Sequence, residues 1–299
     1  MKTGPEISVA VVPVAGLGTR LLPATKSQPK EMLPVAKKPV VQYVVEELGR
    51  NGIKEILFVT GRTKTSIENH FDPDHQLIRN LRESGKEDLL AELDYEQTEV
   101  KFFYTRQRLQ RGLGDAVRCA RRFTQNRPFV VALGDSIIGL DSPTNVVSAM
   151  TRIHRESGAA CVVAVETVSP QDISRYGIVE PGGDGDEFPI LGLIEKPPVG
   201  STSSCLALVG RYVFSPSIYG KLDRIQPGVG GEIQLTDAIQ RLLEEGETVI
   251  GVRLPETERR YDIGNFESYF ETFVEFALRD PDLGPGLRKR LLERLVEDH

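Results

Sequence analysis

The 299-residue sequence contains no tryptophan and only three cysteines. Cys119, Cys161 and Cys205 are odd in number and lie far apart, which argues against a disulfide framework and against a zinc site. We therefore expect reduced thiols, as in a cytoplasmic protein. The four histidines lie in no recognisable motif, so acid–base chemistry built on histidine is not indicated.

The sequence also lacks an apolar run long enough to span a membrane, and residues 1–9 lack the apolar core of a signal peptide. The net charge of −6 argues against general nucleic-acid binding. With 27% charged and 39% hydrophobic residues, the composition is ordinary for a soluble globular protein. We expect a cytoplasmic protein that has neither a membrane nor a nucleic acid as its partner.

Two common phosphate-binding motifs are absent as well. GxxxxGK[ST] occurs nowhere in the chain. The dinucleotide fingerprint GxGxxG fails because Leu21 stands at its third glycine and Pro23 follows. The missing glycine disfavours a nucleotide-dependent oxidoreductase.

In their place, the β-branched run 7–14 predicts a buried strand, followed by the loop 15–39, which is rich in glycine and proline. The small residues of Ala15-Gly16-Leu17-Gly18 let backbone amides approach an anion closely, and Arg20 and Lys30 can neutralise it. Open α/β sheets bind ligands at the carboxyl ends of their strands. The loop is therefore predicted to bind a phosphate-bearing ligand, although a basic surface loop would be the simpler interpretation of any one of its motifs.

The order of apolar segments predicts an α/β fold with a Rossmann-like mixed, mostly parallel sheet and helices on both faces. We expect one domain, residues 1–280, with a small β-rich insertion at about 173–214, and a helical extension, 281–299, that packs on the core or on a second subunit. The helices are expected at 40–50, 63–71, 76–96, 113–123, 144–156, 231–243, 266–279 and 287–297. The strands are expected at 7–14, 53–60, 100–104, 129–133, 159–166, 177–180, 190–195, 206–214 and 248–254.

The pattern GxGTRxxPxTxxxPKxxxP, from Gly16 to Pro34, resembles the opening of the sugar-1-phosphate nucleotidylyltransferases. Its continuation, KEMLPVAKKPVVQYVVEEL, is similar to that of the bacterial UTP–glucose-1-phosphate uridylyltransferases. Three further motifs, LGD, EKP and GGEIQLTDAI, follow in the order found in that family. The resemblance covers about Ser8 to Leu278, and four motifs in order are far more specific than any one.

The resemblance implies a set of residues around the nucleotide. An amide at Gln107 can both donate to and accept from the edge of a pyrimidine, which is one way to recognise uracil. Glycines at 112 and 114 predict a turn pressed against a flat ligand. Asp115 stands where the family usually has histidine. The nucleotide-binding residues implied are Ala15, Gly16, Gly18, Thr19, Gln107, Gly112 and Gly114.

The same resemblance places the catalytic charges. Arg20 and Lys30 would hold the triphosphate, and Lys196 would hold the sugar phosphate. Asp135 follows the apolar strand 129–133, and a carboxylate at that edge suits Mg²⁺ bound to phosphate oxygens. Asp262, in YDIGN, resembles a second metal-binding carboxylate, although a turn former before a glycine is the simpler interpretation.

For the sugar, the resemblance implies Glu195 and Lys196 of EKP, Tyr176, Gly177 and Glu232. We expect the first two side chains to point to opposite sides if the strand continues through them. With its sugar-side insertion, the domain would be a nucleotidyltransferase domain whose β-rich part binds the hexose.

The reaction implied is UTP plus glucose 1-phosphate giving UDP-glucose and pyrophosphate, with Mg²⁺, in a homodimer or homotetramer. Because a sugar phosphate is already an oxyanion, no general base is needed, and catalysis would come from charge neutralisation and alignment. The alternatives are an enzyme that uses dTTP or another nucleotide, or another hexose phosphate, and a non-catalytic homologue that binds nucleotide sugars.

Overall fold

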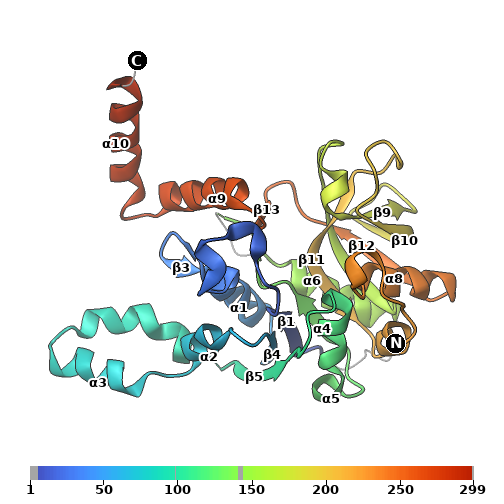
Figure 1. Ribbon diagram of the computed structural model, residues 1–299, viewed down its shortest axis with the longest axis horizontal. Coiled ribbons are helices and arrows are strands. Elements are labelled where there is room, and N and C mark those ends of the chain that lie inside the picture. The colour runs from blue at the N-terminus through green and yellow to red at the C-terminus, as the bar shows by residue number, and fades with distance from the viewer. Residues whose placement is uncertain (1–5, 98, 141–143, 298–299) are drawn as a thin grey trace.

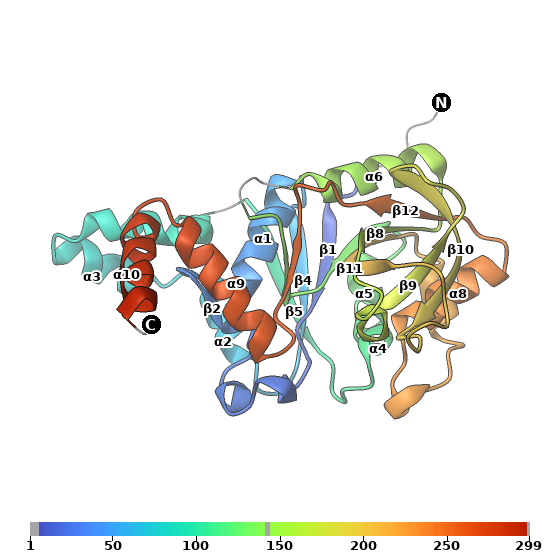
Figure 2. The same cartoon turned by 90° about the horizontal axis from the view of Figure 1, so that it is seen from above.

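The computed structural model describes residues 6–97, 99–140 and 144–297, and its centre is a nine-stranded sheet (Figures 1 and 2). From one edge to the other the strands are β5 (Lys101–Arg106), β4 (Glu55–Thr60), β1 (Val9–Pro13), β6 (Phe129–Ala132), β11 (Leu206–Phe214), β8 (Cys161–Thr167), β12 (Val249–Arg253), β10 (Glu187–Glu195) and β9 (Gly177–Pro181).

Strands β5, β4, β1 and β6 pair in parallel, and their carboxyl ends therefore meet at one edge of the sheet. β11 runs antiparallel to both β6 and β8, and β10 runs antiparallel to β12 and β9. The central strands β1, β6 and β11 are buried along almost their whole length, as expected where helices cover both faces of a sheet, whereas β5 and β10 alternate between less and more exposed residues.

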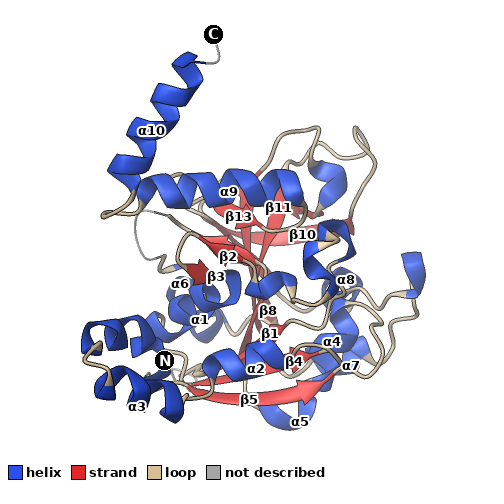
Figure 3. Ribbon diagram, turned by 60° about the vertical axis from the view of Figure 1, so that its left-hand side comes forward, coloured by secondary structure: helices blue, strands red, loops and turns tan. Residues whose placement is uncertain are grey.

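Each face of the sheet has its own hydrophobic core (Figure 3). On one face, α4 (Leu113–Cys119), α7 (Ile218–Leu222) and α8 (Leu235–Glu244) pack on the strands. On the other face lie α1 (Val40–Arg50), α2 (Thr65–Phe71) and α6 (Val146–Ser157). The prediction of a mixed α/β sheet with helices on both faces is confirmed.

The predicted phosphate loop is irregular, as its prolines require. It contains three short 3₁₀ turns, η1 (Thr19–Leu21), η2 (Ala24–Lys26) and η3 (Lys30–Met32), and a small hairpin of β2 (Pro34–Val35) and β3 (Lys38–Pro39). A second small sheet pairs β7 (Ser136–Ile138) with β13 (Arg260–Asp262).

The remaining helices lie toward the periphery of the molecule. α3 (His75–Glu83) and the 3₁₀ segment η4 (Glu87–Gln97) form the predicted exposed excursion on one side, and α9 (Phe266–Arg279) leads into α10 (Gly284–Glu297), which projects away from the body (Figures 1 and 3). Within the described ranges, no helix combines the length and the apolar character that a membrane crossing requires.

Three expectations differ from the structure. The helix expected at 113–123 is interrupted after Cys119 and resumes as α5 (Arg121–Thr124), and the helix expected from 231 begins only at Leu235, after the turn η6 (Val229–Gly231). The β-rich segment 173–214 is continuous with the main sheet, because β11 lies at its centre between β6 and β8. A sugar-binding role for this segment stays a prediction.

Candidate active site

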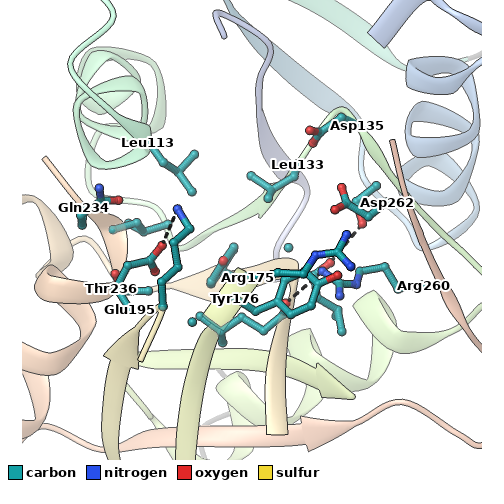
Figure 4. Close-up of a pocket in the computed structure, with 18 of the residues that line it drawn as sticks. Leu113, Leu133, Asp135, Arg175, Tyr176, Glu195, Gln234, Thr236, Arg260 and Asp262 are labelled. Carbon is teal, nitrogen blue, oxygen red and sulfur yellow. Dashed lines mark hydrogen bonds and ion pairs between the residues drawn. The ribbon is translucent and has the colours of Figure 1, made fainter. Parts of the chain in front are cut away.

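A cavity of about 500 Å³ opens beside the end of β6 (Figure 4). Its lining residues come from segments far apart in sequence, namely the phosphate loop, the β6–β7 turn, the starts of β9 and α8, the end of β10, and β13. The predicted residues that line it are Arg20, Asp135, Tyr176, Gly177, Glu195, Lys196 and Asp262. Residues that line it but were not predicted include Leu113, Leu133, Ser136, Arg175, Leu208, Gly210, Tyr212, Gln234, Thr236 and Arg260.

Two carboxylates lie side by side at one end of the cavity. Asp262 pairs with Ser136 across the β7–β13 sheet, and the backbone N–H of Ile263 donates to the carbonyl oxygen of Asp135 at 3.0 Å. Burial, together with the neighbouring charge of Asp135, raises the pKa of Asp262. A cation between the two side chains would relieve this repulsion.

Lys30 supplies one positive charge at this end, since its ammonium forms an ion pair with Asp135 and both side chains are 18% exposed. Burial opposes the charge of Lys30, but attraction by Asp135 and Glu31 outweighs it and holds the pKa of Lys30 above its usual value. Burial likewise disfavours the charge of Asp135, yet Lys30 and Arg20 keep its pKa below the usual value. Both groups are therefore charged at neutral pH.

Glu31, the residue after Lys30, joins the phosphate loop to the segment before α2. Glu31 is buried and accepts a hydrogen bond of 2.9 Å from Lys64, which precedes α2. This buried ion pair joins η3 to the start of α2, and it leaves neither charge unpaired. It thereby helps to fix the segment from which Lys30 reaches Asp135.

The donor set fits Mg²⁺ if phosphate oxygens complete it. Among the described residues, no group of three or more His, Cys, Asp or Glu side chains is arranged to hold a metal ion alone. Mg²⁺ usually binds one or two carboxylates and fills its other positions with water and substrate phosphates. Asp135 and Asp262 provide two such carboxylates.

Across the cavity, Glu195 and Lys196 lie together. β10 ends at Glu195, Lys196 adopts a φ of 44°, and the Lys196 Nζ lies 3.2 Å from Glu195 Oε1. The condition for opposite orientations is not met, because the strand ends at Glu195, and both side chains line the same cavity. The backbone N–H of Lys196 donates to Tyr176 at 3.0 Å, which joins the two predicted sugar-side segments.

Two arginines that were not predicted flank the ring of Tyr176. The Arg260 guanidinium lies 4.1 Å from the ring centroid and the Arg175 guanidinium 5.5 Å from it. Arg260 Nε also donates to Glu166 at 2.7 Å, which keeps this charge paired although the side chain is largely buried. The sequence offered one signal that could have found these arginines, since Arg175 directly precedes Tyr176 and Arg260 lies close to Asp262.

The segment after η6 contributes differently from what was predicted. Glu232 is exposed and does not line the cavity, whereas Gln234 and Thr236 do. The Thr236 hydroxyl is buried and has no hydrogen-bond partner among the described residues. An orphan hydroxyl at a cavity wall is available to a polar ligand.

The residues of the predicted base site differ in exposure. Gln107 is buried, Ala15 is buried, and Gly16 and Thr19 are exposed, while the carbonyl oxygen of Gly18 accepts a 2.8 Å hydrogen bond from Thr25.

The two glycines of this loop are required by packing within the protein. A Cβ on Gly112 or Gly114 would lie 2.7 or 2.8 Å from the carbonyl oxygen of Ile233. The close approach of the Ile233 backbone therefore accounts for both glycines within the protein itself. Contact of these glycines with a nucleotide stays a prediction.

A buried ion pair supports the β6–β7 turn from beneath. Arg211 of β11 is fully buried, and it donates to the carboxylate of Glu47 on α1 at 2.9 and 2.7 Å. The same guanidinium donates to the carbonyl oxygens of Ser136 at 2.9 Å and Gly210 at 3.3 Å. Arg211 thus ties α1 and the bulge in β11 to the turn that carries Asp135.

Comparison with known proteins places these features in a family context. The nucleotidyl transferase family matches residues 9–278, which include every site residue named above. A Staphylococcus epidermidis protein named UTP–glucose-1-phosphate uridylyltransferase is 41% identical over 285 residues, which are 95% of this chain and 96% of that protein.

Solved structures agree with this match. A UTP-bound UGPase from Acinetobacter baumannii superimposes with a TM-score of 0.87 and 37% identity, covering 96% of this chain and 99% of that one. A UDP-glucose pyrophosphorylase complexed with UDP-glucose gives a TM-score of 0.80 and 34% identity, covering 90% of this chain and 98% of that one. The similarity therefore extends over nearly the full length of each chain.

Proposed function

The chain belongs to the nucleotidyl transferase family, and from this premise we propose that it transfers a uridylyl group from UTP to glucose 1-phosphate. The products are UDP-glucose and pyrophosphate. The observation that carries the proposal is that a single cavity joins two clusters of charged residues. Arg20, Asp135 and Asp262 suit a triphosphate at one end, and Glu195 and Lys196 suit a sugar phosphate at the other.

The main obstacle to this reaction is repulsion between two anions, because the sugar phosphate is itself the nucleophile. Arg20 and Lys30 neutralise the triphosphate, and Lys196 holds the attacking phosphate in line with the α-phosphorus. Glu195 and the Thr236 hydroxyl bind hexose hydroxyls. Asp135 and Asp262 would hold Mg²⁺, which supplies positive charge on the phosphate oxygens when it is bound. Assembly into a homodimer or homotetramer and a cytoplasmic location stay predictions.

The substrate assignment is tested by pyrophosphate release across a panel of triphosphates and hexose 1-phosphates. We expect the highest kcat/KM with UTP and glucose 1-phosphate in the presence of Mg²⁺. A preference for ATP or GTP would contradict the base site, and a preference for dTTP would favour the related thymidylyl reaction. If no pair releases pyrophosphate, the non-catalytic alternative replaces the enzyme.

The two lysines are predicted to act on different anions. Lys30→Ala should lower kcat by about 10- to 100-fold, since loss of a charge-assisted hydrogen bond costs roughly 1.5–3 kcal/mol. Lys196→Ala should instead raise the KM for glucose 1-phosphate by a similar factor. Steady-state kinetics with each substrate varied in turn separates the two effects.

Lys26→Ala is the matched control, because Lys26 is an exposed lysine of the same loop, whereas Lys30 is half-buried and forms an ion pair with Asp135. It should leave both parameters within about twofold of the wild type. Unchanged kinetics in either test variant would remove that lysine from the site.

A further inference from the structure

The amide of Gln107 is held by two neighbours that fix its orientation. Gln107 is 4% exposed, and its Nε2 donates to Asp115 Oδ2 at 2.9 Å and to the carbonyl oxygen of Gly112 at 3.1 Å. A carboxylate and a backbone carbonyl can only accept hydrogen bonds. The NH₂ group must therefore face Asp115 and Gly112, and the amide oxygen must face away from them.

Asp115 is itself held in place by two arginines. It is 4% exposed, and its Oδ1 accepts a hydrogen bond of 2.5 Å from Arg118, with Arg111 at 3.5 Å. The two oxygens thus have separate tasks, since Oδ1 pairs with arginine and Oδ2 with the amide. This division keeps an acceptor directed at Gln107.

The strand end that carries Gln107 borders the predicted nucleotide loop. The backbone N–H of Gln107 donates to Thr60 at 2.9 Å, and a Cβ on the following residue, Gly61, would lie 3.1 Å from the carbonyl oxygen of Ala15. Within the described part of the chain, no donor is bonded to Gln107 Oε1. The side chain therefore presents an acceptor and no donor to a ligand in this loop.

We infer that Asp115 is a positioning residue that makes Gln107 a hydrogen-bond acceptor, so that the site selects pyrimidines carrying N3–H and rejects cytosine. Uracil and thymine have a donor at N3, whereas cytosine has a lone pair there that would oppose the Gln107 oxygen. If the amide were free to turn over, its NH₂ group could donate to cytosine N3 and its oxygen could accept from the cytosine amino group. The inference rests on the proposed function, in which Gln107 contacts the base of UTP.

Asp115 also stabilises α4, and the test must separate this structural effect from the effect on the Gln107 amide. It lies in the first turn of α4 and three residues before Arg118, so its charge favours the helix. Loss of that benefit would weaken the use of every nucleotide by the same factor. A change in the ratio between two nucleotides reports on the amide alone.

The experiment compares the ratio of kcat/KM for UTP to that for CTP in the wild type and in Asp115→Leu, which keeps the branching at Cγ but removes the acceptor. We expect the ratio to fall by about tenfold or more, because the amide loses its charged partner and retains only Gly112. The ratio of UTP to dTTP should stay within about twofold, since both bases present the same N3–H edge. Arg118→Gln is the matched control, because it breaks the same ion pair but leaves the acceptor, and its UTP/CTP ratio should match the wild type.

An unchanged UTP/CTP ratio in an Asp115→Leu enzyme that still uses UTP would overturn the inference. An equal fall in Arg118→Gln would also overturn it, because loop disorder would then be the cause. If Asp115→Leu does not fold, competition in the wild type decides. With labelled UTP as the substrate, CTP must inhibit the reaction at least tenfold more weakly than unlabelled UTP does, and equal inhibition would overturn the inference. A wild type that uses no UTP at all would instead refute the proposed function.

Discussion

Asp135→Asn is expected to lower kcat by about 10²- to 10³-fold while leaving the protein folded. The substitution keeps the shape of the side chain but removes the charge that faces Lys30 and Asp262, and loss of one electrostatic group at a reacting phosphate typically has this cost. The Mg²⁺ concentration needed for half-maximal activity should rise. Activity titrated against Mg²⁺, with thermal unfolding as the control for folding, measures both effects.

Asp262→Asn is the comparison that ranks the two carboxylates. Burial and the charge of Asp135 already raise the pKa of the Asp262 carboxyl. Removing the charge of Asp262 should therefore lower kcat less than removing that of Asp135, and we expect mainly a higher Mg²⁺ requirement. A fully active Asp135→Asn enzyme would refute the metal assignment. A larger defect in Asp262→Asn than in Asp135→Asn would reverse the order of the two ligands.

Arg211→Met is expected to lower the free energy of unfolding by about 3–5 kcal/mol, because it leaves the buried Glu47 carboxylate without a partner. Glu47→Gln should also destabilise the protein, because it leaves the buried Arg211 guanidinium without a charged partner. The double variant Glu47→Leu/Arg211→Met should recover much of the stability, since a well-packed apolar pair leaves no uncompensated charge. Urea unfolding of the three variants and the wild type measures these differences.

The exposed pair Arg127–Glu55, with 3.0 Å between its charged atoms, provides the control. Arg127→Met should change the free energy of unfolding by no more than about 1 kcal/mol, because solvent screens both charges. A change below 1 kcal/mol in Arg211→Met as well would mean that the Arg211–Glu47 pair does not hold the turn together.

The sequence alone indicated the parts of the molecule that depend on local patterns. Apolar runs predicted the strands of the parallel half of the sheet, and the prolines of 15–39 predicted its irregular loop. The strand that precedes Asp135 placed this carboxylate at the sheet edge where the cavity opens. These predictions succeeded because the side-chain period and the backbone limits of proline act within a few residues.

Contacts between distant segments were decided only by the tertiary structure. Because β11 lies at the centre of the sheet, Arg211 reaches Glu47, which is separated from it by 164 positions. Glu195 and Lys196 face one cavity because the strand ends between them, and the packing of Ile233 determines why glycines stand at 112 and 114. None of these contacts has a local signature, since each depends on which strands become neighbours and on how closely their connecting loops then pack.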